Sequence, residues 1–136
     1  MSRPFRLTSR VLREHPQHKQ IADVLRLEIG PEGRLSAHGV LWYSIDQADY
    51  GGAVPGTRTA RGVCAGVPDV FLLFRGRAHF AEVKADDGIL SDAQRSLIAA
   101  TLGASGRVAV VRDAKDMLAC LDEWHIPRAG RVRVAA

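Results

Sequence analysis

Two apolar runs, at residues 70–74 and 78–84, lie close together and constrain the fold more than any other feature of the chain. Valine and phenylalanine recur in both runs, and these residues favour pleated strands. The Arg75-Gly76-Arg77 segment between them has the length of a hairpin loop, so we expect the two strands to pair antiparallel. A turn at Gly76 places residues whose numbers sum to roughly 152 opposite one another, and the sequence leaves this register open.

The chain before this hairpin predicts one helix, one strand and a long connection. Apolar residues at spacings of three to four indicate an amphipathic helix over 14–27, and the segment 30–33, Gly-Pro-Glu-Gly, is expected to end it. The run 39–45 is aromatic and β-branched, which favours a strand. Residues 46–64 are polar, rich in glycine and without periodicity, so we expect a long loop there.

The chain after the hairpin predicts a helix, a strand and a second helix. Ser91, with Gln94 three residues later, forms the capping-box pattern that begins a helix. Residues 107–111 are an apolar run typical of a buried strand, and Asp113 is expected to cap a last helix that Pro127 ends. A helix between two strands favours a parallel crossover. The predicted fold class is therefore α/β, with a mixed central sheet flanked by helices.

Length and composition indicate one globular domain over 1–136, with a core at about 14–127 and a basic tail at 128–136. Hydrophobic residues make up 46% and charged residues 25% of the chain, the balance of an ordinary soluble protein. No apolar run approaches the roughly 18 residues that cross a bilayer, and no secretion signal is visible. We expect a cytoplasmic protein without a membrane partner. Its two cysteines show no Cys-x-x-Cys pairing that would indicate structural zinc.

Acidic residues and a lysine gather around the predicted hairpin. Asp69 follows Pro68, which favours an extended backbone and places the carboxylate at the mouth of a strand. Glu82 and Lys84 lie two residues apart on a strand and therefore project from the same face. Two carboxylates from adjacent strands, joined by the backbone carbonyl of Val83, predict a site for Mg2+ or Mn2+. A lysine beside that ion is suited to orienting or deprotonating an attacking water.

The charge balance is compatible with a nucleic-acid partner. Nineteen Lys and Arg against fifteen acids give a net charge of +4 and a pI near 9.6. Such a surface attracts polyanions, although charge alone is a weak indicator. Arg58 and Arg61 lie in a Gly/Thr-rich segment outside the apolar runs. They are candidate contacts to nucleic-acid phosphates, which would make binding salt-sensitive, and the alternative is that they are solvated loop charges.

Three motifs, in this order and spacing, resemble the virus-type replication-repair nuclease domain, a branch of the PD-(D/E)xK nucleases. They are Gly66-Val-Pro-Asp69, Glu82-Val-Lys84 and Gly88-Ile-Leu-Ser-Asp-Ala-Gln94, and the resemblance covers about residues 14–127. It implies a restriction-endonuclease-like αβββαβ core. It also implies a Mg2+- or Mn2+-dependent endonuclease that hydrolyses DNA phosphodiester bonds at branched structures, encoded on phage or prophage and acting as a homodimer.

The same resemblance assigns roles to five residues. Asp69 and Glu82 would hold the metal, Lys84 would position water, and Gln94 would support the site. Glu14 matches an early helix glutamate that joins the metal site in this family, although the His-Pro pair after it makes its register less secure.

Each of these residues also has a structural alternative. Asp69 alone suits a turn that leads into a strand, and Glu82 with Lys84 suits a solvated pair on an edge strand. Gln94 is explained equally well as a capping-box residue, and Glu14 as a favourable charge at a helix N-terminus. A catalytically silent DNA-binding or interaction module with the same fold is therefore the alternative function. An exonuclease remains open within the enzyme class.

Overall fold

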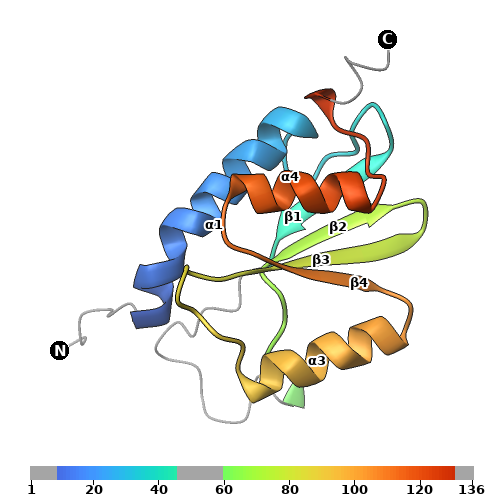
Figure 1. The fold of residues 1–136 in the computed structure, drawn as a ribbon. Helices are drawn as coiled ribbons and strands as arrows, with labels where there is room; N and C mark the ends of the chain where they lie inside the picture. Colours follow the sequence, from blue (N-terminus) through green and yellow to red (C-terminus); the bar gives the residue numbers. More distant parts are fainter. Residues whose placement is uncertain (1–8, 46–59, 131–136) are drawn as a thin grey trace, which may run out of the picture.

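A four-stranded mixed sheet forms the centre of the fold (Figure 1). The computed structural model describes residues 9–45 and 60–130, with side chains from residue 16 onward. The strands are β1 (Val40–Ser44), β2 (Val70–Phe74), β3 (Arg77–Val83) and β4 (Arg107–Val111), and they lie in this order across the sheet. The first two pairs are antiparallel, and β3 with β4 is parallel. The α/β class, the mixed sheet and the parallel crossover are confirmed.

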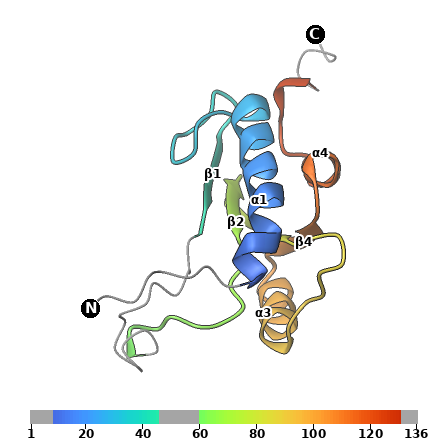
Figure 2. The ribbon, with the colours of Figure 1, turned by 90° about the vertical axis from the view of Figure 1, so that its left-hand side faces the viewer.

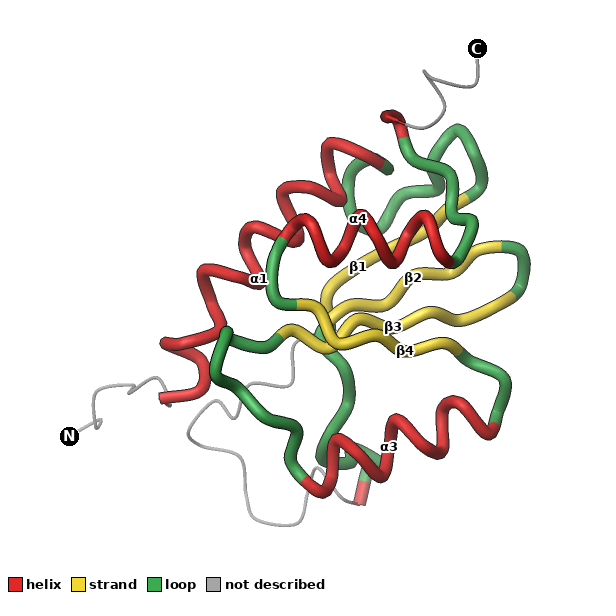
Figure 3. The backbone as a smooth tube through the Cα atoms, in the orientation of Figure 1, coloured by secondary structure: helices red, strands yellow, loops and turns green. Residues whose placement is uncertain are grey.

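Helices cover both faces of this sheet. The helices are α1 (Ser9–Glu28), α3 (Asp92–Gly103) and α4 (Ala114–Glu123). Figure 3 shows α1 and α4 together on one side of the strands and α3 on the other, and the side view in Figure 2 shows the same separation of α3 from α4. No helix in the described part of the chain combines the length and apolar character needed to span a bilayer.

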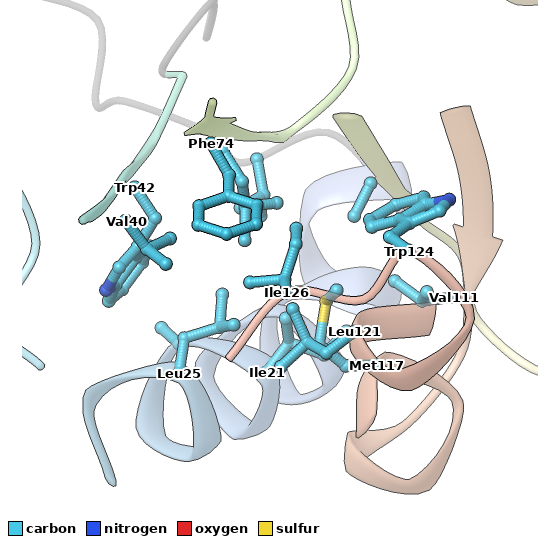
Figure 4. Packing of buried hydrophobic residues seen from close by; sticks show 14 of the residues in the cluster. Ile21, Leu25, Val40, Trp42, Phe74, Val111, Met117, Leu121, Trp124 and Ile126 are labelled. Carbon is cyan, nitrogen blue, oxygen red and sulfur yellow. The ribbon is translucent and has the colours of Figure 1, made fainter. Parts of the chain in front are cut away.

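The core lies between the sheet and the pair α1 and α4 (Figure 4). Trp42 is buried in it, and its indole Nε1 donates a hydrogen bond to the carbonyl oxygen of Gly30 at 2.7 Å. This bond fixes the segment that ends α1 against β1. The other large, fully buried apolar residues are Ile21, Leu25, Val40, Val70, Leu72, Val83, Val111, Met117 and Leu121.

The first helix begins earlier than predicted. It starts at Ser9, and Pro16 lies inside it, whereas the sequence predicted a start at residue 14. Proline is best tolerated in the first helical turn, and Pro16 lies beyond the first turn of this helix. The amphipathic pattern is confirmed where Ile21, Ala22 and Leu25 face the core. Glu14 consequently lies in the second turn of α1 rather than at its N-terminus.

The β2–β3 turn is tighter than predicted and shifts the register by one residue. Arg75 and Gly76 form a two-residue loop, and both have positive φ angles, of 50° and 73°. Such a turn matches the twist of the flanking strands. Val70 pairs with Ala81, so partner numbers sum to 151 and not to 152. Val70 and Ala81 form the last pair, and the N–H of Asp69 also donates to the Ala81 carbonyl, so Asp69 lies at the same end of the hairpin as Glu82.

The predicted basic tail begins later than residue 128. The guanidinium of Arg128 binds both carboxylate oxygens of Asp122 in α4, at 2.8 and 3.1 Å. Its side chain is 14% exposed. Arg128 therefore belongs to the folded core, and residues 131–136 lie outside the described part of the chain.

His79 is a buried histidine whose titration should affect stability. Its side chain lies in β3 against Trp124, with ring centroids 5.1 Å apart. Burial lowers the pKa of His79, and the positive charges of Arg107 and Arg77 add to this shift. Because the folded state disfavours the protonated ring, unfolding takes up a proton once the pH falls below the ordinary histidine pKa of about 6.5.

We therefore expect the free energy of unfolding to fall between pH 7 and pH 5, by at most about 1.4 kcal/mol per pH unit from this group. The His79→Leu variant should lose much of this dependence. Urea denaturation of both proteins across this pH range checks the prediction. Identical pH profiles for the variant and the parent would contradict it.

Candidate active site

The two acidic residues of the predicted site lie at the same end of neighbouring strands. Asp69 immediately precedes β2 and Glu82 lies near the end of β3. The last pair between β2 and β3 is Val70 with Ala81, and the N–H of Asp69 also donates to the carbonyl of Ala81. Asp69 and Glu82 therefore lie beside this pair, at the same end of the two strands. Two carboxylates brought to one end of the sheet are candidates for a shared metal site.

Asp69 is fixed by three hydrogen bonds at the end of the strand ladder. Its carboxylate Oδ2 accepts a bond from the backbone N–H of Val83 at 2.8 Å. Its own N–H donates to the carbonyl of Ala81 at 3.2 Å, and its carbonyl accepts from the N–H of Ile45 at 2.7 Å. The side chain thus stabilises the strand end, in agreement with the structural alternative. A carboxylate held so rigidly is also positioned to bind a cation.

Glu82 is completely buried, at 0% exposure, in the interior of the sheet. Its strand β3 lies between β2 and β4, so the alternative of a solvated pair on an edge strand is wrong. Its Oε1 accepts a hydrogen bond from the side-chain amide of Gln94 at 2.7 Å. Taking a carboxylate out of water is costly. Neighbouring groups must therefore compensate this cost, and the amide of Gln94 is one of them.

Gln94 makes hydrogen bonds through both atoms of its side-chain amide. Its backbone N–H donates to Ser91 Oγ at 3.1 Å, and its side-chain Oε1 accepts from the Ser91 N–H at 2.8 Å, which completes the capping box. Its Nε2 is left to bind Glu82. The amide oxygen thus caps the N-terminus of α3, and the amide nitrogen orients the Glu82 side chain. One side chain therefore links the start of the helix to the buried carboxylate.

Lys84 is buried directly after β3. Its side chain is 4% exposed, and its backbone N–H donates to the Val111 carbonyl at 3.0 Å. A Cβ atom placed on Gly88 would lie 3.4 Å from Lys84 Cδ, so the turn at Gly88 packs closely against the lysine stem. Continued alternation along the strand places this side chain on the face of Glu82.

Gly66 holds the loop before Asp69 close to α3. It has a φ of +88°, and a Cβ there would lie 2.5 Å from the carbonyl oxygen of Ala93. No other residue fits this approach without movement of the backbone. The glycine of the Gly-Val-Pro-Asp motif thus connects the strand that carries Asp69 to the helix turn that carries Gln94.

Arg112 is a positioning residue that sequence reasoning missed. Its guanidinium donates to three carbonyl oxygens of the turn after Lys84, those of Ala85, Asp86 (3.3 Å) and Gly88 (3.0 Å). Arginine presents several donors in a rigid fork, which suits this cluster of acceptors. Nothing in the sequence marks the residue, because it lies 24 or more positions from the carbonyls that it binds.

Replacing Arg112 with lysine should loosen this turn, because an ammonium keeps the charge but cannot reach all three carbonyls. We expect the free energy of unfolding to fall by about 2 kcal/mol. The Gly88 N–H, which donates to the Ala85 carbonyl at 2.9 Å, should exchange its hydrogen faster. Hydrogen exchange of the peptide spanning 84–91 measures this effect. Unchanged exchange in the variant would show that the turn holds without Arg112.

The remaining predicted residues are less completely described. Glu14 lies in α1, but its side chain is outside the described part, and Arg58 falls in the undescribed segment 46–59. Arg61 is exposed. Among the described residues, no group of three or more His, Cys, Asp or Glu side chains could hold a metal ion.

The donor set is nevertheless compatible with magnesium. The described part offers two carboxylates at the same end of two paired strands, those of Asp69 and Glu82, next to the main chain of Val83. Mg2+ typically takes one or two protein carboxylates and completes its shell with water and substrate phosphate. The residues present therefore fit a hard divalent cation of this kind.

Comparison with known proteins agrees with this geometry. Residues 17–115 match the VRR-NUC domain family. No curated protein and no solved structure matches the chain significantly. The matched region contains Asp69 before β2, Glu82 within β3, Lys84 after β3 and the helix turn with Gln94. The chain therefore belongs to the VRR-NUC family of nuclease domains.

Proposed function

We propose that this domain is a divalent-metal-dependent deoxyribonuclease whose active site comprises Asp69, Glu82 and Lys84. The single observation that carries the proposal is the burial of Glu82, at the same end of the sheet as Asp69 and oriented by Gln94. A fold tolerates a buried, oriented carboxylate when its charge is used, and the half-buried carboxylate of Asp69 nearby would complete a pair that suits a cation.

Asp69 and Glu82 would hold Mg2+ or Mn2+, with the Val83 carbonyl and Glu14 as further ligands. When bound, such an ion lowers the pKa of a coordinated water and stabilises charge on a phosphate. The hydrogen bonds from Val83 to Asp69 and from Gln94 to Glu82 keep both carboxylates in place before substrate arrives. This preorganisation avoids a cost of rearrangement during reaction.

Lys84 would act on the water that attacks the phosphorus atom. Its position two residues after Glu82 would bring the ammonium toward the carboxylates, and its side chain is buried from bulk solvent. It would orient the attacking water or take up its proton, and its charge would stabilise the negative oxygens of the transition state. The turn at Gly88, fixed by Arg112, limits the positions that the lysine stem can adopt.

DNA is the proposed substrate, and the net charge of +4 favours its approach. Arg58 and Arg61 are proposed to contact backbone phosphates, so the affinity should fall as salt is raised. We further propose branched DNA and a homodimer, because the resemblance to the virus-type replication-repair nuclease domain implies both, and a four-way junction presents two symmetric strands to a twofold assembly. A monomeric mass in solution at micromolar concentration would contradict the dimer.

A cleavage assay tests the proposal directly. Supercoiled, linear and four-way-junction DNA are incubated with Mg2+, with Mn2+ or with EDTA, beside the Lys84→Ala variant. We expect cleavage that requires the metal and is lost in the variant, and nicking of closed circles would distinguish an endonuclease from an exonuclease. Equal activity in the variant and the parent would refute the assignment.

The alternative, a catalytically silent module, makes a different prediction for metal binding. Calorimetric titration with Mn2+ should show heat of binding in the parent and little in Asp69→Asn. A parent that binds DNA but neither cleaves it nor takes up Mn2+ through Asp69 would establish the silent module instead.

A further inference from the structure

An aromatic row on one face of the sheet lies next to the two carboxylates. Tyr43 pairs with Phe71 across β1 and β2, and Phe71 pairs with Phe80 across β2 and β3. The ring centroids are 5.0 Å apart in the first pair and 5.3 Å apart in the second. Asp69 and Glu82 each stand two residues from this row along their strands, a step of about 6.6 Å.

The β1 end of this row is open to solvent. Tyr43 is 42% exposed, and Leu73, which projects from the same face, is 37% exposed. The opposite face of the same strands is covered by α1 and α4, and Trp42 and Leu72 are fully buried there. Exposed apolar side chains normally occur singly. A group of them beside a candidate active site marks a contact surface.

Helix α3 also leaves part of this face uncovered near the β2–β3 hairpin. A pocket of about 420 Å³ separates Phe80 and Ala78 of β3 from Thr101 and Ala104 at the C-terminal part of the helix. Figure 3 shows α3 on this side of the strands, closest to β4. Within the described part of the chain, this face is therefore accessible around Tyr43 and Leu73, whereas Glu82 beside it is buried.

We propose that Tyr43, supported by Phe71, stacks against a nucleobase of the DNA strand held at Asp69 and Glu82. This inference rests on the proposed function and extends it to substrate structure. A base in a duplex has both π faces covered by its neighbours, so a stacking platform selects an unpaired nucleotide. The enzyme should thus prefer DNA with unpaired nucleotides next to the cleaved bond.

The spacing of the two features supports a nucleobase as the occupant. The Ile45 N–H donates to the Asp69 carbonyl, so Tyr43 lies one strand across and two residues along from Asp69, roughly 8 Å by strand geometry. Successive phosphates in one strand of B-form DNA advance about 3.4 Å along the axis, so this span corresponds to about two nucleotides. Tyrosine combines an apolar ring with a polar hydroxyl that tolerates water, as a transient base contact requires. The net charge of +4 favours a polyanion over a second basic copy of this chain.

The test combines a protein change with a matching DNA change. Binding of a single-stranded oligonucleotide is measured in the Lys84→Ala background, where cleavage is suppressed, against a series in which one abasic site is moved along the strand. Tyr43→Ala should weaken binding of the intact strand about tenfold. In the protein that retains Tyr43, an abasic site at one position of the strand should weaken binding by the same factor. The two changes together should give no further loss.

Matched variants control for indirect effects. Tyr43→Phe keeps the ring and should bind within about twofold of its parent. Leu35→Ala removes another apolar side chain, 75% exposed, outside the sheet, and should leave binding unchanged. Independent losses from Tyr43→Ala and the abasic site, or no loss from either, would overturn the stacking proposal. So would a Tyr43→Ala effect confined to self-association without DNA, which would assign the face to a second copy.

Failure of this inference can be told apart from failure of the proposed function. A parent protein that cleaves DNA with Mg2+ but ignores the abasic series overturns the stacking role alone. A parent protein that neither binds nor cleaves any of the DNA substrates overturns both.

Discussion

Replacing Glu82 with glutamine is expected to abolish DNA cleavage while leaving the fold intact. Glutamine has nearly the same size, and its side-chain oxygen still accepts the hydrogen bond that Gln94 Nε2 donates to Glu82 at 2.7 Å. The substitution removes the negative charge that would bind the cation. Since metal assistance contributes several kcal/mol to such a hydrolysis, the rate should fall by about a thousandfold or more.

Initial rates on labelled DNA at saturating Mg2+ measure the loss, and circular dichroism with thermal denaturation establishes that the variant is folded. Asp92→Asn is the matched control, because it neutralises a carboxylate in the first turn of α3 whose side chain is 98% exposed. It should cleave at the parent rate. A folded Glu82→Gln protein that retained the parent rate would remove Glu82 from the active site.

Local sequence signals predicted most of the elements that frame this site. Ser91 and Gln94 predicted the start of α3, and Asp113 predicted the start of α4, because side chains that bind backbone N–H groups one turn away act over short distances. The hairpin was predicted from two apolar runs around a glycine. Its register was not, because the tight turn places Arg75, a residue with a Cβ, at a positive φ that sequence patterns do not favour.

The sequence could not decide the surroundings of Gln94, Glu82 and Arg112, because these depend on contacts between distant segments of the chain. The sequence left Gln94 between a capping role and a catalytic one, and the structure gives its two amide atoms separate partners. It also allowed a solvated edge-strand position for Glu82, which the pairing of β3 with β4 excludes. Arg112 gave no signal at all. Motif residues can be identified from short stretches of sequence. A residue such as Arg112, which binds a distant turn, can be identified only from the folded structure.

The largest loss of stability without a direct effect on the site is expected from Arg128→Ala. Arg128 binds Asp122 of α4 through two hydrogen bonds, and its Nη1 lies 3.4 Å from a carboxylate oxygen of Glu28, the last residue of α1. That oxygen also accepts from the Gly130 N–H at 3.0 Å. Because the Arg128 and Glu28 side chains are each 14% exposed, removing the guanidinium leaves acidic groups largely shielded from water.

We expect the free energy of unfolding to fall by about 2 kcal/mol and the melting temperature by roughly 6 to 10 °C. Arg26→Ala is a matched control, since Arg26 also binds a carboxylate twice, that of Glu32 at 2.9 and 3.0 Å, with side chains 47% and 45% exposed. Exposed pairs contribute little, so this variant should melt close to the parent. Equal losses in the two variants would show that burial does not decide the strength of these pairs. A small loss of unfolding free energy in Arg128→Ala would instead support the basic tail that the sequence predicted from residue 128. An arginine that does not hold α1 against α4 contributes its charge to the surface and not to the stability of the core.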